Sequence, residues 1–288
     1  MRSLRTFWPR ACAAIAVAGT TLAAIVYAGG ASAAAGRQTY LQLNMCGNAC
    51  NHGGLAVVRN LESSIVVGRP FAVTLNEVCE NQYDQLRADL GAYDGRFDAT
   101  GPRCGNGSRY GNAILVRTQG VDPVGSWQLP NPAGDETRRL MCLRTRPPGT
   151  PPLVVCVTHI SNVEANIAAQ IGVIADILRG LGGTEAVLLG GDFNTDPADA
   201  RLNPLYSTCY GSGTGVFEEA DSAGCGSRAT TETVRGVDAV NEDTFQRHKL
   251  DYIFLSDGHW STARANAVDA ANGLSDHDAL WATATLRG

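Results

Sequence analysis

Side chains that can bind metal ions or phosphate recur at the ends of apolar segments of this chain. The clearest case is AVLLGGDFNTDP, residues 186–197, where an apolar segment typical of a buried strand runs into Asp192 and Asn194. Connections that merely turn favour Gly, Asn, Asp and Pro, so a strand followed by a turn explains this segment on its own. In α/β folds, however, ligands bind at the carboxyl ends of strands. The interpretation therefore depends on whether other segments supply partners.

Other apolar segments carry the same kinds of side chain at or near one end. They are Asn44 in YLQLNM, Glu77 in FAVTLNEV, His159 in LVVCVTH, Asp251 in KLDYIFLS, and Asp276 with His277 in GLSDHDAL. One acidic strand end is ordinary, but the repetition indicates a shared site, because a buried carboxylate without a partner is costly. Asp, Glu and Asn supply oxygen ligands, which suit Mg²⁺, Mn²⁺ or Ca²⁺ rather than zinc.

Together these residue types describe the metal-assisted hydrolysis of a phosphate ester. A divalent ion neutralises charge on a phosphoryl group and lowers the pKa of an attacking water. A histidine beside it can move a proton or stabilise the charged transition state. A carboxylate bonded to that histidine fixes its tautomer and raises its pKa. The spacing of these residues does not name the substrate.

At these residues the sequence resembles the endonuclease/exonuclease/phosphatase superfamily, and it looks like an exported, bacterial-type member. This group includes pancreatic DNase I, apurinic endonucleases, bacterial sphingomyelinases and inositol phosphatases. The resemblance extends from Asn44 to His277 in the family's order; GDFNTDP and LSDHDAL are its most specific motifs, and LNEV and VTHIS are weaker. It implies a DNase I-like α/β fold, a four-layer α/β-sandwich in which two packed mixed sheets are flanked by helices.

The resemblance also implies which residues bind the metal ion and which residue acts as the acid/base. Asn44 and Glu77 would hold the divalent ion, which is Mg²⁺ or alternatively Mn²⁺ or Ca²⁺, and Asp276 would complete or approach that site. Asp251 would pair with His277, the expected acid/base.

A further group of residues is implied to handle water and phosphate. Asp192 would orient or activate the attacking water, while Asn194 and His159 would contact the scissile phosphate. Tyr110 and Asn112, in RYGNAIL, lie where family members place additional phosphate contacts.

One position departs from the pattern of several nucleases in the group. Those enzymes carry a basic residue two positions after the glutamate, whereas this chain has Cys79 there. The departure puts in doubt a DNA contact typical of those nucleases and separates this chain from close DNase I relatives.

The first 33 residues have the three-part pattern of a secretory signal peptide. An arginine-containing start is followed by an apolar, small-residue segment and by an A-x-A cleavage site after Ala33. A retained membrane anchor is the alternative, because the apolar segment approaches the length of a span. We expect cleavage, secretion, no stable membrane anchor afterwards, and a single domain over 37–288 that acts as a monomer.

The cysteine count agrees with export. Outside the leader the chain has eight cysteines, an even number that indicates disulfides. Cys142 and Cys156 lie equally far from a turn at Gly149, so they would face each other across a hairpin. Three other pairs are predicted by nearness alone: Cys46–Cys50, Cys79–Cys104 and Cys209–Cys225. Zinc is the weaker interpretation, because no CxxC pair is present.

Apolar segments typical of strands alternate with fewer helical segments, which favours two packed sheets in one α/β domain. The expected strands are 40–45, 71–78, 112–117, 139–144, 153–159, 186–192, 250–256 and 279–286. The strongest helical pattern covers 161–183, with a capping box at Ser161 and Glu164 and glycines at its end. Shorter helices are expected within 53–67 and 81–92, and long loops at 94–111, 128–137 and 203–243.

Charge gives mixed guidance on the substrate. Removing the three arginines of the leader leaves 20 basic residues against 28 acidic ones, a net charge of −8 that argues against a general polyanion binder. Residues 95–117 and 137–163 are rich in arginine and poor in acid, which indicates either a solvated face or an anion-facing groove.

We therefore expect a secreted, divalent-metal-dependent phosphodiesterase, with the DNA or RNA backbone as the leading substrate. The alternative keeps the site and changes the substrate to that of a sphingomyelinase-like lipid phosphodiesterase or an inositol-phosphate-type phosphatase. Insertion into a membrane would need an exposed apolar loop, and the long loops are polar instead. A binding module with a decayed site is the least favoured, since no expected catalytic position is empty.

Overall fold

The apolar segments of the sequence form the central strands of two six-stranded sheets. The computed structural model describes residues 37–118, 120–222, 224, 228 and 248–287. The first sheet has the order β11 (Trp260–Val268), β12 (Ala279–Leu286), β1 (Arg37–Asn44), β2 (Ala72–Cys79), β4 (Tyr110–Val116) and β3 (Asp94–Ala99). The second has the order β5 (Asp122–Gln128), β6 (Arg139–Thr145), β7 (Leu153–His159), β8 (Ala186–Asp192), β10 (Asp251–Ser256) and β9 (Phe217–Glu219).

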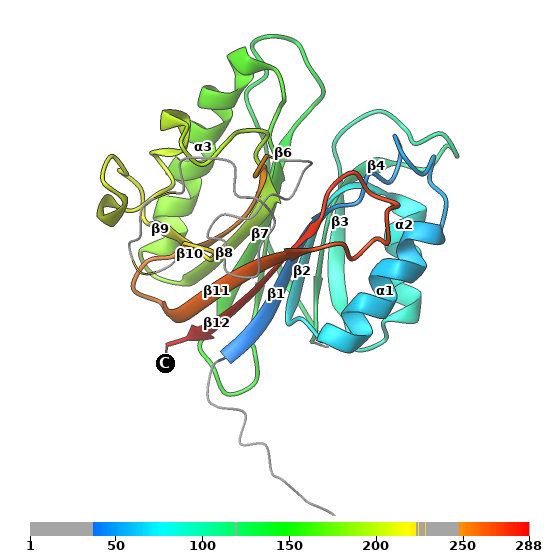
Figure 1. The fold of residues 1–288 in the computed structure, drawn as a ribbon, viewed down its shortest axis with the longest axis horizontal. Helices are drawn as coiled ribbons and strands as arrows, with labels where there is room; N and C mark the ends of the chain where they lie inside the picture. The colour runs from blue at the N-terminus through cyan, green and yellow to red at the C-terminus, as the bar shows by residue number, and fades with distance from the viewer. Residues whose placement is uncertain (1–36, 119, 223, 225–227, 229–247, 288) are drawn as a thin grey trace, which may run out of the picture. The chain divides into compact units, whose positions relative to one another are not determined.

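Helices cover the outer faces of both sheets. Figure 1 shows α1 (Ala56–Gly68) and α2 (Glu80–Asp89) against the first sheet and α3 (Glu164–Gly182) against the second. Two short 3₁₀ helices, η1 (Ala200–Leu202) and η2 (Thr208–Tyr210), follow β8. The predicted four-layer α/β-sandwich is confirmed. None of the described helices combines the length and the apolar character that a membrane span needs.

Apolar side chains fill the three spaces between these layers. Ile114 and Leu280 are fully buried between the two sheets. Leu61 and Leu75 are fully buried between the first sheet and its helices, and Ile171 between α3 and the second sheet. Full burial of such a side chain contributes roughly 1.5–3 kcal/mol. The central strands therefore contribute apolar side chains from both of their faces to the packing between the layers.

The strand register places the polar strand ends at one edge. β1 and β2 are parallel with Asn44 opposite Asn76, and β7 and β8 are parallel with His159 opposite Asp192. β10 is antiparallel to β8, so its first residue, Asp251, also lies opposite Asp192. A register shift of one residue would turn these side chains to the other face of the sheet.

The start of α3 differs from the prediction. The helix begins at Glu164 with Val163 as its N-cap, and no side chain caps it, so the capping box at Ser161 is wrong. Ser161 Oγ instead donates to Asp135 Oδ2 at 2.5 Å and accepts the Val163 N–H at 3.0 Å. A carboxylate is a stronger hydrogen-bond partner than a backbone amide, which explains why the hydroxyl turns away from the helix.

Four strands have no counterpart among the predicted strands. The loop predicted over 94–111 is wrong in its first six residues, which form β3, and in its last two, which begin β4. The described part of 203–243 contains η2 and β9. β3, β5, β9 and β11 are the outermost strands of the two sheets. Edge strands pair on one side only and are half-exposed, so their sequences lack the continuous apolar pattern of central strands.

Three of the predicted disulfides are present. Cys142 and Cys156 lie directly opposite each other on β6 and β7 with a Cα–Cα distance of 4.1 Å. Cys46 is bonded to Cys50 and Cys79 to Cys104. The fourth predicted pair includes residue 225, which lies outside the described residues, as does the predicted leader.

We expect Asp199 to stabilise the fold in a pH-dependent way. The Arg201 side chain bonds its carboxylate at 2.9 Å, Thr195 Oγ1 donates at 3.1 Å, and the pKa of Asp199 falls from 3.8 to about 2. Because the folded-state pKa is the lower one, the stabilisation is complete above pH 3.8 and is lost as the pH falls through 2.

Asp199→Asn should therefore lower the free energy of unfolding by about 1 kcal/mol at pH 7, since the pair is partly exposed. As the pH falls below 2, the urea concentrations at which the variant and the parent unfold should converge. An equal loss at neutral and at acid pH would contradict the electrostatic explanation.

Candidate active site

Asn44 joins the two sheets at the edge where their strands end. Its Nδ2 donates to Glu77 Oε1 at 3.0 Å and to Asp192 Oδ2 at 3.1 Å. Its Oδ1 accepts the Cys46 N–H at 3.0 Å. One side chain of β1 therefore contacts an acid of β2 and an acid of β8. The two residues expected to bind metal lie together, beside the carboxylate expected to activate water.

Glu77 departs from regular strand geometry. Its φ is +55°, and the register between β2 and β4 shifts between Leu75 and Val78. A left-handed conformation costs a non-glycine residue roughly 1–3 kcal/mol and persists only where the surroundings over-determine it. Asn194, with φ of +47°, shares this feature. Backbone strain of this kind gathers at functional sites, and here it coincides with two of the predicted site residues.

Asp251 and His277 form the predicted pair. His277 Nδ1 lies 2.7 Å from Asp251 Oδ2, and Nε2 lies 3.7 Å from Asp192 Oδ2. Gln42 Nε2 donates to the other oxygen of Asp251 at 3.2 Å across the space between the sheets. All three members of the Asp192–Asp251–His277 cluster are buried.

Burial and the charges of this cluster shift the pKa of His277 and the pKa of Asp192. Burial alone would lower the pKa of His277, but the Asp251 carboxylate, with Asp192, outweighs it and raises that pKa to about 9. Burial and then the charge of Asp251 raise the pKa of Asp192 to about 7. At neutral pH the imidazole is therefore cationic and can donate a proton, while Asp192 is partly ionised and can accept one in its carboxylate form.

His159 and Asn194 lie on the other side of Asp192. His159 Nε2 is 3.2 Å from Asn194 Nδ2 and 3.5 Å from Asp192 Oδ2, and Asn194 Nδ2 also donates to the Ile160 carbonyl at 2.8 Å. Burial, with the charges of Arg138 and His277, holds the pKa of His159 well below its usual range. The ring is therefore neutral and accepts the amide. The structure brings these two predicted phosphate contacts together.

Asn76 connects the site residues and escaped the sequence analysis. Its Oδ1 accepts the Asp192 N–H at 2.9 Å and Gln42 Nε2 at 2.8 Å. Its Nδ2 donates to Asn112 Oδ1 at 3.0 Å and to the Thr158 carbonyl at 2.9 Å. All four hydrogen bonds of a buried amide are thus made. The available signal was its place beside Glu77 in the LNEV motif.

The two looser phosphate-contact predictions fall in different surroundings. Asn112 is buried and bonded to Asn76, at the base of the site. Tyr110 is buried beside Glu77, and burial, followed by the charge of Glu77, raises the pKa of its hydroxyl. Tyr110 thus keeps its proton and can donate a hydrogen bond at any physiological pH.

Asp276 lies at the rim of the site. It is exposed, and a carboxylate oxygen lies within 4.8 Å of the sulfurs of Cys46 and Cys50. The preceding Ser275 donates from Oγ to the Asn44 carbonyl at 2.7 Å, which ties this segment to the end of β1. The structure thus places Asp276 near the predicted metal ligands without a direct bond to them.

Arg138 is a second residue that the motif search missed. Its side chain is only 7% exposed, and Glu136 Oε2 lies 3.7 Å from its Nη2. Among the described residues, its Nε has no hydrogen-bond partner. A buried guanidinium with an unused donor is costly unless an anion joins it. The acid-free stretch that begins at residue 137 was the available signal.

Comparison with known proteins decides the assignment. A family model described as the Endonuclease/Exonuclease/phosphatase family matches residues 41–277. This chain belongs to that family. It is therefore a metal-dependent hydrolase of phosphate esters. A search of curated proteins finds no match.

Solved structures show the fold of the endonuclease/exonuclease/phosphatase family at low sequence identity. The chain resembles humanized D. rerio TDP2 carrying 14 mutations, with 16% identity, a TM-score of 0.64, and 86% of this chain and 99% of that chain covered. The human Nocturnin catalytic domain with bound sulfate is 17% identical with a TM-score of 0.65, and the match covers 87% of this chain and 95% of that chain. A mannosyl-6-phosphatase of Bacteroides thetaiotaomicron is 14% identical with a TM-score of 0.62, and the match covers 86% of this chain and 100% of that chain. At these identities the likeness shows the fold alone.

The residues present fit the divalent metal that the endonuclease/exonuclease/phosphatase family requires. Asp192, Asp251 and His277 are close enough to ligate an ion together, but His277 Nδ1 is already bonded to Asp251. Glu77 offers carboxylate oxygens, and Asn44 has an amide oxygen that already accepts the Cys46 N–H and keeps a second lone pair. Hard divalent cations prefer such oxygen ligands. A cation there would also oppose the burial and the charge of Asp251 that together raise the pKa of Asp192.

Proposed function

We propose that this chain is an exported, divalent-metal-dependent phosphodiesterase whose leading substrate is the nucleic acid backbone. One observation supports it most: Asp192 lies between two groups of side chains, one proposed for proton transfer and the other for phosphate binding. On one side are His277 and Asp251, and on the other are His159 and Asn194. Proton transfer and phosphate binding thus meet at one buried carboxylate.

The reaction follows from these positions. Asn44 and Glu77, with Asp276 at the rim, would hold the cation, which supplies charge neutralisation of the phosphoryl group and a more acidic water. Asp192 would orient that water and accept its proton. Asn194, His159 and Arg138 would contact the phosphate oxygens, and Tyr110 with Asn112 would line the same site. His277, kept cationic by Asp251, would stabilise the transition state and protonate the leaving oxygen.

The disulfides support export. Three bonds are present in the described residues, and such bonds form and persist in oxidising compartments. Together with the leader pattern of residues 1–33, they favour a secreted enzyme.

The arginine-rich segments offer fewer unpaired positive charges to a nucleic acid backbone than their composition indicates. Arg109 pairs with Glu80, Arg139 with Asp98 at 3.0 Å, and Arg144 with Glu185 at 2.7 Å. These pairs neutralise three of the eight arginines in residues 95–117 and 137–163. Recognition would therefore rest on the scissile phosphate and on Arg138 rather than on a long basic surface.

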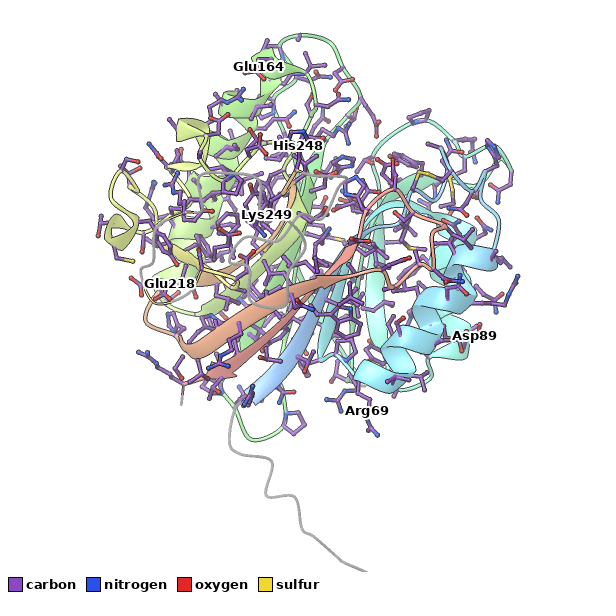
Figure 2. The ribbon with its side chains drawn as sticks, viewed as in Figure 1. Arg69, Asp89, Glu164, Glu218, His248 and Lys249 are labelled. Carbon is purple, nitrogen blue, oxygen red and sulfur yellow. A yellow bond between two sulfur atoms is a disulfide. The ribbon has the colours of Figure 1, made fainter. Side chains whose placement is uncertain are left out.

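Because a small phosphate ester needs no long basic surface, a second candidate function is a phosphatase for an inositol phosphate or a similar polyol phosphate that uses the same site. A lipid surface is less favoured. The large apolar side chains exposed in the described residues are Val66, Val67 and Val268. Val66 and Val67 lie at the end of α1, next to Arg69, which Figure 2 labels. This end of α1 precedes the start of β2, whereas Glu77 lies near the other end of that strand.

Hydrolysis by the oxidised chain tests the proposal. Supercoiled plasmid, single-stranded RNA, sphingomyelin vesicles and an inositol polyphosphate would each be incubated with Mg²⁺, with Mn²⁺ and with EDTA. Metal-dependent nicking of the plasmid or cleavage of the RNA is the expected result. Release of phosphate from the inositol ester alone would favour the second candidate. Cleavage that survives EDTA would refute the site.

A further inference from the structure

The two residues expected to bind metal share a sequence feature that the proposed function does not use. Asn44 and Glu77 are each followed, two positions later, by a disulfide-bonded cysteine, Cys46 and Cys79. β1 and β2 are parallel neighbours with Asn44 opposite Asn76. Both cysteines therefore lie at the same edge of the sheet, next to the site.

The loop closed by Cys46–Cys50 holds both ligands. The Cys46 N–H donates to Asn44 Oδ1 at 3.0 Å, and the Gly47 N–H donates to the Glu77 carbonyl at 2.9 Å. A Cβ added to Gly47 would lie 2.5 Å from that carbonyl oxygen, so the two segments are in close contact. The first loop thus fixes the side-chain amide of Asn44 and the backbone of Glu77.

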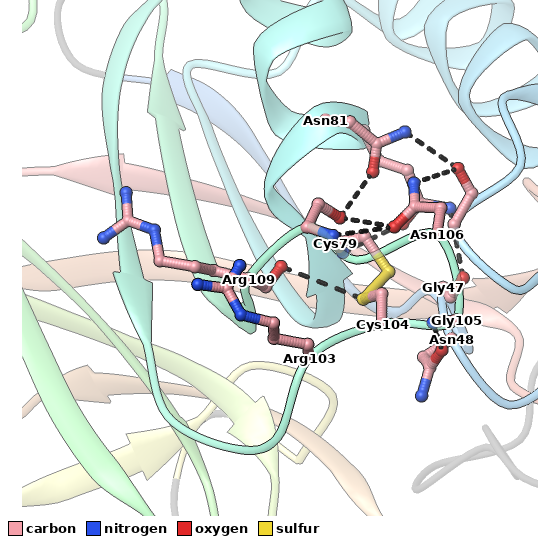
Figure 3. Close-up of a disulfide and its surroundings, with 12 residues drawn as sticks. Gly47, Asn48, Cys79, Asn81, Arg103, Cys104, Gly105, Asn106 and Arg109 are labelled. Atoms are coloured by element: carbon pink, nitrogen blue, oxygen red, sulfur yellow. Dashed lines mark hydrogen bonds between the residues drawn. A yellow bond between two sulfur atoms is a disulfide. The ribbon is translucent and has the colours of Figure 1, made fainter.

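The loop closed by Cys79–Cys104 begins at the last residue of β2, and Figure 3 shows this disulfide with its surroundings. Hydrogen bonds join α2 and the residues just after Cys104 to the first loop and the residues just after it. These bonds run from Gly105 N to Asn48 Oδ1 at 2.8 Å, from Asn81 Nδ2 to the Gly53 carbonyl at 2.8 Å, and from Asn106 Nδ2 to the same carbonyl at 3.3 Å. The segments that carry the two disulfides are therefore hydrogen-bonded to each other and form one unit.

This unit surrounds backbone that needs external support. Glu77 and Cys46 both have positive φ, at +55° and +45°. Such conformations relax when the contacts that over-determine them are removed. Opening either disulfide would leave the hydrogen bonds alone to resist that relaxation, and the loop would gain conformational entropy that metal binding must then repay.

We propose that Cys46–Cys50 and Cys79–Cys104 are positioning disulfides that hold Asn44 and Glu77 for the divalent cation, so that cation affinity is acquired when these bonds form. The inference rests on the metal role that the proposed function gives to Asn44 and Glu77. A dithiol reductant would reverse it: each disulfide takes up two electrons and two protons and becomes two thiols, while the dithiol closes to a cyclic disulfide. The enzyme is thus weak in a reducing compartment and fully active after oxidation.

Binding of Mn²⁺ to the oxidised chain in the absence of substrate tests the inference, with free Mn²⁺ followed by electron paramagnetic resonance. The paired changes Cys46→Ala/Cys50→Ala and Cys79→Ala/Cys104→Ala are each expected to weaken the affinity at least tenfold. The matched control is Cys142→Ala/Cys156→Ala, which removes the disulfide between β6 and β7 and should change the affinity less than twofold.

Circular dichroism would establish which variants fold. Gly47→Ala, which keeps every disulfide and presses on the Glu77 carbonyl, should also weaken Mn²⁺ binding, and it serves where a cysteine variant does not fold. Unchanged affinity in the folded variants, equal weakening by the control, or no binding by the parent chain would overturn the inference. Metal-dependent hydrolysis with unchanged Mn²⁺ affinity would refute this inference alone. Disulfide-dependent Mn²⁺ binding without hydrolysis of any ester would refute the proposed function alone.

Discussion

Replacing His277 with alanine should lower kcat for phosphate ester hydrolysis by roughly 10²- to 10⁴-fold, the range that a positioned acid or base contributes. The imidazole is buried, bonded to Asp251 at 2.7 Å, and held cationic because that carboxylate raises its pKa to about 9. Alanine removes the proton donor and the positive charge together. KM should change much less, because the side chains expected to contact the phosphate remain.

Steady-state kinetics on one soluble diester would measure this effect. Asp251→Asn should also lower kcat, since the neutral amide no longer holds the imidazolium. His259→Ala is the matched control, because that ring lies at the turn between β10 and β11 with Nε2 3.2 Å from the Gly182 carbonyl. A loss of less than threefold in His277→Ala would show that another group moves the proton.

Lys249→Met should lower the free energy of unfolding by about 3–5 kcal/mol, the cost of leaving buried charge without its partner. Lys249, labelled in Figure 2, lies just before β10 with a side chain only 2% exposed. Its Nζ is 3.1 Å from Glu219 Oε1 and 2.5 Å from Asp221 Oδ2. The methionine would fill the space of the stem and leave two buried acidic side chains without their cation.

Urea unfolding at two pH values would measure the loss. Burial, with the charge of Asp221, already raises the pKa of Glu219 to about 8, above its usual 4.5. A raised carboxyl pKa means that the folded state loses stability as the pH rises through this range. The loss in Lys249→Met should therefore be larger at pH 8 than at pH 5.

A triple variant separates charge from packing. Adding Glu219→Gln and Asp221→Asn to Lys249→Met removes the stranded charges and should restore part of the lost stability, because replacing a whole buried ion pair is often nearly neutral. Loss of less than 1 kcal/mol in Lys249→Met alone would contradict the prediction. So would a triple variant less stable than the single one.

The central strands could be predicted from the sequence because both of their faces are buried. Residues 153–159 and 186–192 form strands with the predicted bounds, since a continuous apolar segment of that length has few other uses. β5 and β11 could not be predicted in the same way. Their alternating or polar patterns reflect one partner and partial exposure, and a single sequence does not distinguish such strands from loops.

The site residues also fall into two groups: those that lie in sequence motifs, and those whose role depends on contacts made only in the folded structure. Residues in specific motifs, such as Asp192 and His277, were predictable and lie 3.7 Å apart. Asn76, Gln42 and Arg138 were not, because their importance comes from contacts between the two sheets or from burial. Contacts between strands far apart along the chain leave no local pattern.

The position of β12 determines when during synthesis the site can exist. It is the last strand in chain order, yet it lies between β11 and β1 and pairs with the first strand. The segment that carries His277 directly precedes it. A chain synthesised from its amino end contains Asn44 and Glu77 long before it contains His277, the residue proposed to donate the proton. Every nascent chain that stops before residue 277 lacks this side chain, so the proposed site is completed in one step rather than by degrees.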